Sequence, residues 1–267
     1  MQFNELYELL ELPEEVRQAL GQYEKIRSYE PDETLTKNLL CRETWDEAVK
    51  DLRESLGEDP DGIRILYEML AIVWKDSYKE YIKRGIEKEI FVDTMKFVAR
   101  FLNEHKRVYG TYRFVWDWWF PRQMALQEFR IGALEYELVD TSEPVISIHI
   151  PSDADMSPDS ITDSLNHFRD FLELHFPKWR DVRYCCDSWM LSPSLPKLLN
   201  SDSNILNFQR RFEVENTNWD SLAVLDWVFP GYREVSAELP EKTSLQRSMK
   251  AYLLSGEKVG WSKGYMK

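Results

Sequence analysis

The segment that decides the fold is Arg183-Tyr-Cys-Cys-Asp-Ser-Trp-Met-Leu-Ser-Pro193, which we predict to be a β-strand that stops before its proline. Two thiols, a carboxylate and a hydroxyl lie in it, whereas a buried strand usually carries Val, Ile and Leu. Polar side chains in such a strand are hydrogen-bonded, or they lower the stability of the fold. The segment is therefore either a functional edge of a sheet or a well-satisfied polar part of the core.

Strands and helices alternate around this segment. Residues 130–139 alternate between polar and apolar side chains, as a half-buried strand does, and residues 145–150 form a second strand that Pro151 ends. Ser157 is a hydroxyl cap that begins an amphipathic helix. Further along, we predict strands at 182–189 and 221–229 and helices at 194–199, 204–211 and 244–254, with 204–211 leading into Phe212-Glu-Val214. This alternation predicts an α/β arrangement for residues 128–267.

The first part of the chain, residues 1–127, is predicted to be a helical domain. Apolar residues recur there at three- and four-residue intervals. Thr44 and Glu47 have the spacing of a capping box before a helix that Gly57 ends, and another helix is expected to begin at Gly85. The fold class is therefore α+β, with a helical N-terminal domain followed by a mixed α/β domain.

An aromatic-rich segment, Tyr112–Gln127, leads from the first predicted domain to the second. It contains Trp116, Trp118 and Trp119. Such a cluster serves either as a ligand wall or as a wedge that packs two domains together, and we favour the wedge because large rings bury much apolar area. A structural or oligomer-forming role for the protein would rest on this segment alone.

The composition excludes several classes of partner. The 267 residues include 34 basic and 47 acidic side chains, for a formal net charge of −13. That balance argues against nucleic acid and against an anionic membrane surface, because both need a basic face. Three cysteines make no disulfide framework, and neither a signal peptide nor an apolar stretch of membrane-spanning length is visible. We expect a soluble cytoplasmic protein, whose oligomeric state the sequence leaves open.

The histidines do not predict a metal site. The chain has four, at positions 105, 149, 167 and 175, and no two combine with cysteine at a spacing typical of zinc ligands. Neither a dinucleotide-binding fingerprint nor a glycine-rich phosphate loop is present. We therefore expect no metal.

The second half of the chain resembles the GNAT acyltransferase architecture. Several of its short sequence segments resemble those of a bacterial family of acyltransferase-domain proteins. That family joins a helical N-acyltransferase N-terminal domain to a GNAT-like C-terminal domain. The matching strings are Phe129-Arg-Ile-Gly-Ala-Leu-Glu-Tyr-Glu137, His149-Ile-Pro151, Cys186-Asp-Ser-Trp-Met-Leu-Ser-Pro193, Ser203-Asn-Ile-Leu-Asn-Phe-Gln-Arg-Arg-Phe212 and Thr243-Ser-Leu-Gln-Arg247. They cover most of residues 128–267 in the family's order.

The resemblance implies a CoA-dependent N-acyltransferase that moves an acyl group from acyl-CoA or acetyl-CoA to a small-molecule or peptide amine. It implies that the pantetheine arm lies along the backbone of Ile148 and Ile150. The pyrophosphate would sit at the helix start near Ser157, where free amides favour anions. Arg210 and Arg211 are candidates for the compensating positive charge, with Arg210 the one we assign to the donor site. The acceptor would lie between the two domains, beside the tryptophans of the aromatic-rich segment.

The loop before that helix departs from the family pattern. Residues 151–156 contain no glycine, and they carry Asp153 and Asp155. A carboxylate near a pyrophosphate repels it unless it points away. This departure supports the alternative function, a degenerate GNAT-like binding or regulatory module without catalysis.

Several residues could supply the acyl-transfer chemistry. A base must take the proton of the amine. His149 is a candidate because free imidazole titrates near neutrality, and Glu135 or Glu137 is another. Cys186 and Ser188 are candidates for a nucleophile or for the proton donor to the leaving thiolate. Each has a structural alternative: a backbone-bonded histidine, a solvated acidic face, or a small buried side chain.

Overall fold

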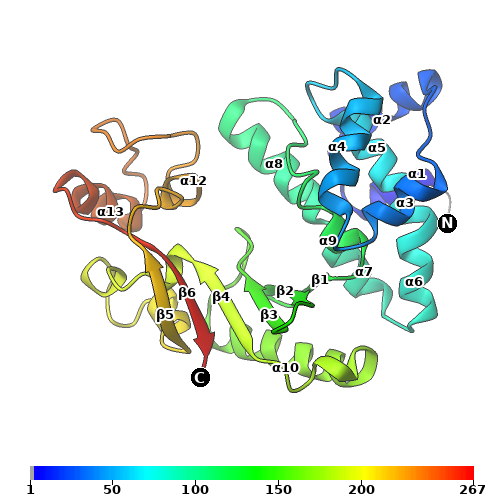
Figure 1. The fold of residues 1–267 in the computed structure, drawn as a ribbon. Helices are drawn as coiled ribbons and strands as arrows, with labels where there is room; N and C mark the ends of the chain where they lie inside the picture. Colours follow the sequence, from blue (N-terminus) through cyan, green and yellow to red (C-terminus); the bar gives the residue numbers. More distant parts are fainter. Residues whose placement is uncertain (1–2) are drawn as a thin grey trace. The chain divides into compact units, whose positions relative to one another are not determined.

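The computed structural model describes residues 3–267, in which the chain forms two compact units that meet between Ile131 and Gly132 (Figure 1). The first unit is helical and the second contains a mixed sheet with helices. The α+β prediction is thereby confirmed. Among residues 3–267, no helix combines the length and apolar character that crossing a bilayer requires.

The first unit is built from short helices whose apolar stripes are buried. Its elements are α1 Phe3–Leu9, α2 Glu14–Ile26, α3 Glu33–Leu39, α4 Trp45–Leu56, α5 Ile63–Ile72, the π-helical turn η1 Val73–Ser77, α6 Tyr78–Lys83, α7 Lys88–Met95, α8 Phe97–Tyr109, α9 Pro121–Met124 and the strand β1 Glu128–Ile131. In α4, Ala48, Val49, Leu52 and Leu56 are buried at helical spacing.

Two local predictions in this unit are wrong. The Thr44 hydroxyl does not cap α4; it donates to the backbone oxygen of Asn38 at 2.9 Å. Gly85 does not begin a helix either. It takes a φ of +68° just after α6, in the left-handed region that glycine adopts without strain, and α7 begins three residues later.

The sheet of the second unit joins one parallel pair to antiparallel neighbours. Its strands are β2 Leu134–Val139, β3 Val145–His149, β4 Tyr184–Ser188, β5 Phe212–Asn218 and β6 Trp261–Met266, in the order β2-β3-β4-β6-β5. β3 and β4 are parallel, while β2 pairs with β3, and β6 with both β4 and β5, in antiparallel fashion. The parallel pair is connected through a helix, as a crossover of this kind requires.

That helix, α10 Pro158–His175, covers one face of the sheet (Figure 1). The ring of Tyr136 on β2 stacks on Phe168 at 3.9 Å between centroids, and its hydroxyl hydrogen-bonds Ser164 Oγ at 2.8 Å. Ile146 and Ile148 on β3 are buried on the same side as Tyr136. Because side chains alternate along a strand, the neighbours of these residues point to the opposite face.

Short helices after β4 build a second part of the core. They are η3 Trp189–Leu191, η4 Leu195–Lys197, α11 Asn204–Gln209, α12 Val224–Val228 and α13 Ser244–Leu254, while η2 Pro177–Trp179 lies before β4. α12 and α13 bury Leu225, Phe229 and Met249 in one apolar cluster.

Two predicted strands differ from the structure. The strand at 221–229 is wrong, since the segment contains α12, whose Val224, Leu225 and Val228 enter the apolar cluster at helical spacing. The strand at 130–139 is interrupted at Gly132, where φ is +62°. β6 was not predicted at all.

Candidate functional site

The face of the sheet opposite α10 is polar. Cross-strand pairing aligns its side chains in two rows. One row runs Glu137, Ser147, Cys185 and Tyr265, and the other contains Glu135 paired with His149 and Asp187 paired with Lys263. Glu135 and Glu137 are buried on this face, and buried charges lower stability unless they are paired. This face is therefore the candidate site.

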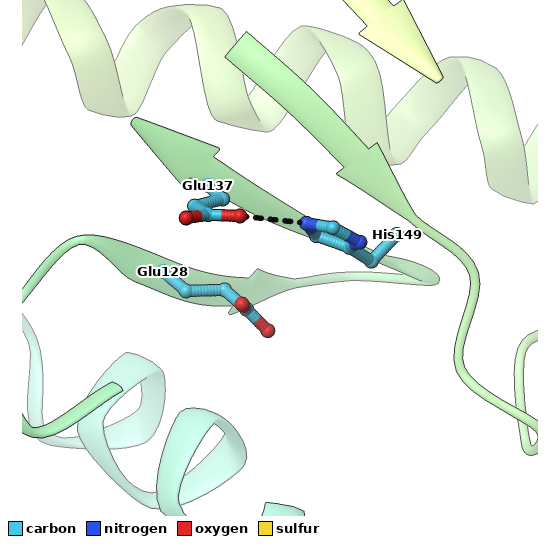
Figure 2. A group of neighbouring side chains, drawn as sticks. All are labelled: Glu128, Glu137 and His149. Carbon is cyan, nitrogen blue, oxygen red and sulfur yellow. Dashed lines mark hydrogen bonds and ion pairs between the residues drawn. The ribbon is translucent and has the colours of Figure 1, made fainter. Parts of the chain in front are cut away.

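The central contact of this face joins β3 to β2. His149 Nε2 donates to Glu137 Oε2 at 3.1 Å (Figure 2). The side chain of Glu137 is 6% exposed and that of His149 is 25% exposed, so the acid is shielded while the imidazole reaches solvent. An imidazole that donates through Nε2 to a carboxylate keeps Nδ1 as its basic nitrogen. The pair therefore has the arrangement of a base held in place by an acid.

The pairing register decides which acid contacts the histidine. Glu135 lies directly across from His149 in the register, and Glu137 lies diagonally from it. The long side chain of Glu137 spans the diagonal, as cross-strand neighbours of this kind do. Glu135 is also buried, at 6% exposure. The structure thus brings both predicted acids to His149 and gives Glu137 the hydrogen bond.

Glu128, which Figure 2 also draws, belongs to the first unit. Its fully buried carboxylate accepts hydrogen bonds from Trp119 Nε1 at 3.0 Å and from Gln123 Nε2 at 2.8 Å. Glu137 and His149 are also of residue types that bind metals. The pair as it stands suits proton transfer.

Cys186 and Ser188 lie on the face that α10 covers, not on the face of His149. Cys186 pairs with Ile148, is 1% exposed, and has its pKa raised by burial and by the neighbouring Cys185 and Asp187. A thiol held in its protonated form is a poor nucleophile. The Ser188 hydroxyl accepts from the amide of Met190 and caps η3. The geometry therefore favours structural roles for both residues.

The polar face carries a cation that the sequence reasoning missed. Burial opposes the charge of Lys263, but Tyr265, Cys185 and Asp187 together raise its pKa. The guanidinium of Arg183 lies 4.2 Å from the centre of the Tyr265 ring, a cation–π contact. Lys263 and Tyr265 belong to β6, so only a prediction of that strand would have revealed them.

The region predicted for the donor begins where β3 and β4 part. Their parallel ladder ends at the pair Ile148–Cys186. The chain then reaches Ile150 and the loop 151–157 before α10. The backbone of Ile148 and Ile150 thus lies at the point where the two strands cease to pair.

The start of α10 already holds an anion of the protein itself. Asp155 accepts from the Ser157 amide at 2.9 Å and from the Ser157 hydroxyl at 3.0 Å. The same hydroxyl accepts from the Ser160 amide at 3.4 Å. A carboxylate at a helix N-terminus is stabilised by the amides and dipole there, so Asp155 occupies the place expected for a phosphate.

Arg211, rather than the predicted Arg210, contacts the first turn of α10. Arg211 Nη2 donates to Pro158 O at 3.1 Å and to Thr162 Oγ1 at 2.8 Å. Arg210 instead donates to Asn207 Oδ1 at 2.8 Å and to Ser201 O at 2.6 Å, within the α11 region. Of these two arginines, Arg211 is therefore the one that contacts the start of α10.

Two family models match the chain. A GNAT-like C-terminal domain matches residues 128–266, and an N-acyltransferase N-terminal domain matches residues 1–126. No curated protein sequence matches the chain significantly.

Solved acyltransferases have the same fold. An acyltransferase in complex with decanoyl-CoA and teicoplanin has a TM-score of 0.77 and 25% identity, with 98% of this chain and 86% of that chain covered. An acyltransferase in complex with CoA and 10C-teicoplanin has a TM-score of 0.77 and 24% identity, and a mutant with octanoyl-CoA has 0.78 and 23%, with the same coverage.

Proposed function

We propose that this chain, which belongs to the acyltransferase family with an N-acyltransferase N-terminal domain and a GNAT-like C-terminal domain, transfers an acyl group from acyl-CoA to an amine. The observation that carries the proposal is the His149–Glu137 pair, which lies on the polar sheet face one residue beyond the end of the β3–β4 ladder. This location supports the proposal, since His149 as the base would then lie beside the part of the sheet that would hold the donor.

In the proposed reaction the amine nitrogen attacks the thioester carbon. A C–N bond forms, the C–S bond breaks, and CoA leaves as its thiolate. His149 takes the proton of the amine at Nδ1 and releases it to the thiolate or to solvent. Glu137 orients the ring and stabilises the imidazolium, as the acid of a catalytic triad does for its histidine.

The donor would lie along the end of the β3–β4 ladder. Backbone groups of Ile148 and Ile150 are the proposed partners of the pantetheine arm. The Ser157 amide and hydroxyl would have to release Asp155 and donate to the pyrophosphate instead, with the Asp155 carboxylate displaced. Arg211 stands at the first turn of α10 and is better placed than Arg210 to balance the added negative charge.

The acceptor is proposed to be a small molecule or peptide with a primary amine. Similar acyltransferases have been solved with teicoplanin and a teicoplanin derivative. The net charge of −13 favours a cationic acceptor through long-range attraction. We assign residues 1–127 and 128–267 as the functional domains and place the protein in the cytoplasm, where its free cysteines stay reduced.

Thermal unfolding with decanoyl-CoA, CoA and decanoate tests the donor proposal. A ligand that binds the native state raises the unfolding temperature by mass action. We expect a rise with decanoyl-CoA and with CoA, and the same rise in His149→Ala, because that residue acts on the amine. Equal curves with and without either CoA compound at millimolar concentration would contradict the proposal.

A second candidate function is a GNAT-like module that no longer binds CoA. Asp155 at the start of α10 favours it, since it mimics a bound anion. The variant Asp155→Asn separates the two functions. If the donor binds there, removing the charge tightens CoA binding severalfold; if the module has lost the site, CoA binds neither protein.

A further inference from the structure

A cavity lies in the second unit, and the His149–Glu137 pair does not line it. It has a volume of about 280 Å³. The segment 219–222 after β5, helix α12 and the end of α13 surround it. Its apolar lining consists of Trp219, Leu222, Val224, Leu225, Val235, Leu253 and Val259. None of these residues belongs to the proposed transfer site.

The cavity walls are held in place by the core. Val224, Leu225, Leu253 and Val259 are members of the buried apolar cluster of this unit. The Trp219 ring packs on Gly260, where an added Cβ would lie 3.2 Å from its Cε3 atom. The indole therefore lies close against the chain just before β6.

Large apolar side chains at the rim are exposed. Trp219 is 44% exposed and Leu222 is 54% exposed. A contiguous exposed apolar patch beside a cavity is typical of a ligand-binding site. The volume exceeds the roughly 150 Å³ of an apolar cavity that binds benzene. An aliphatic chain of medium length therefore fits the space and the lining.

The charged groups at the rim favour a cationic head group. Asp220 and Lys258 form an ion pair at 2.5 Å, and both side chains are more than half exposed. Glu257 also lines the cavity, and its carboxylate accepts from the Tyr252 hydroxyl at 3.3 Å. With two carboxylates and one ammonium the lining is net negative, which attracts an amine and repels a fatty acid.

We infer that this cavity binds the aliphatic chain of an amphiphilic primary amine, with the chain inside and the ammonium group at the rim beside Glu257. The inference rests on the lining and charges of the cavity and is independent of the proposed acyl transfer. Chain burial supplies the affinity, and the rim supplies the preference for a cation.

Isothermal titration with hexylammonium, octylammonium and octanoate tests the inference. Each added methylene should tighten binding about fourfold, as expected for its burial. Octylammonium should bind two- to fivefold more tightly than octanoate, and Glu257→Gln should remove that preference. Affinity that does not change with chain length, or octanoate binding as tightly as octylammonium, would overturn the inference.

Two variants test where the aliphatic chain of the ligand binds. Leu222→Ser should weaken octylammonium binding about threefold or more, and Val235→Phe should fill the cavity and abolish binding. Leu254→Ser is the matched control, since Leu254 is a leucine of similar exposure, 49%, that does not line the cavity. Equal effects of the two serine variants would contradict the location, even if Val235→Phe fails to fold.

Measurements with saturating CoA and with the variant His149→Ala test whether this cavity is separate from the acyl-transfer site. Neither should change the affinity for octylammonium. Displacement of octylammonium by CoA would place the chain in the transfer site and overturn the inference. Loss of CoA binding with octylammonium binding intact would instead contradict only the proposed function.

Discussion

The two units each bury a carboxylate against a basic side chain, but with opposite consequences. In the first unit, Glu68 is fully buried and its oxygens accept from Arg27 Nη2 at 2.6 Å, from Arg27 Nε at 2.8 Å and from the Tyr23 hydroxyl at 3.1 Å. Burial and the negative charge of Glu68 raise the pKa of Tyr23 to about 12. Because the Arg27 guanidinium stays protonated, this cluster cannot transfer a proton and has a structural role.

In the second unit, Glu137 is nearly as buried, but its partner is an imidazole that is a quarter exposed. Histidine changes charge near neutral pH, whereas arginine does not. The difference between the clusters shows that the partner decides what a buried carboxylate does. A permanent cation makes it a structural link, and a titratable, accessible one makes it part of a proton-transfer pair.

The largest expected effect is on catalysis in the second cluster. His149→Ala should lower kcat/KM for acyl transfer by roughly 10²- to 10⁴-fold, the range for loss of a general base. The thermal midpoint should stay close to that of the unmodified protein. Release of CoA thiol from decanoyl-CoA with a panel of primary amines measures the rate. His167→Ala, an exposed histidine on α10, is the matched control and should leave the rate unchanged.

The next effect belongs to the first cluster and should appear only in stability. Arg27→Met leaves the Glu68 carboxylate buried without its cation, which should lower the free energy of unfolding by about 3 kcal/mol. Urea denaturation measures it, with Lys37→Met as the control because the Lys37–Glu33 pair is exposed. A fall in kcat for Arg27→Met without loss of stability would contradict the contrast between the clusters.

The sequence predicted both domains and most of the elements around the site. Ser157 caps its helix through its side chain as predicted, because such a local hydrogen bond depends on near neighbours in the chain. The strands at 145–150 and 182–189 were also found from local patterns. Elements that depend on tertiary packing were the ones missed.

β6 shows why. Gly264 and Ser262 give it a composition that is poor for a strand. Yet a Cβ at Gly264 would lie 2.9 Å from the backbone oxygen of Glu213, so the neighbouring strand requires glycine there. A related reason limits what the sequence says about the candidate site. His149 and both acids follow from alternation along each strand, but the contact between His149 and Glu137 depends on the register between strands, which no local pattern states.

A smaller effect separates the two acids beside His149. Glu137→Gln keeps an oxygen that accepts the hydrogen bond but removes the charge that stabilises the imidazolium, so kcat should fall roughly tenfold with KM for the donor unchanged. Glu135→Gln, the matched control across the register, should have the weaker effect. If Glu135→Gln has the larger effect, the pairing in Figure 2 is not the catalytic one.

The smallest expected effect concerns the thiol that the sequence singled out. Cys186→Ala should change turnover less than twofold, since burial raises the pKa of that thiol and α10 covers its face of the sheet. A thiol reagent should modify Cys41, which is partly exposed, in the folded protein and should reach Cys185 and Cys186 only after unfolding. Fast modification of all three in the native state would reverse this assignment.

The dependence of kcat/KM on pH, compared between the unmodified protein and His149→Ala, tests the central claim most directly. An imidazole that already carries a proton cannot accept one from the amine, so activity should fall as the pH drops through the titration of His149. The residual activity of His149→Ala should lack that acid limb. The same limb in both proteins, with similar rates, would contradict the assignment of His149 as the base.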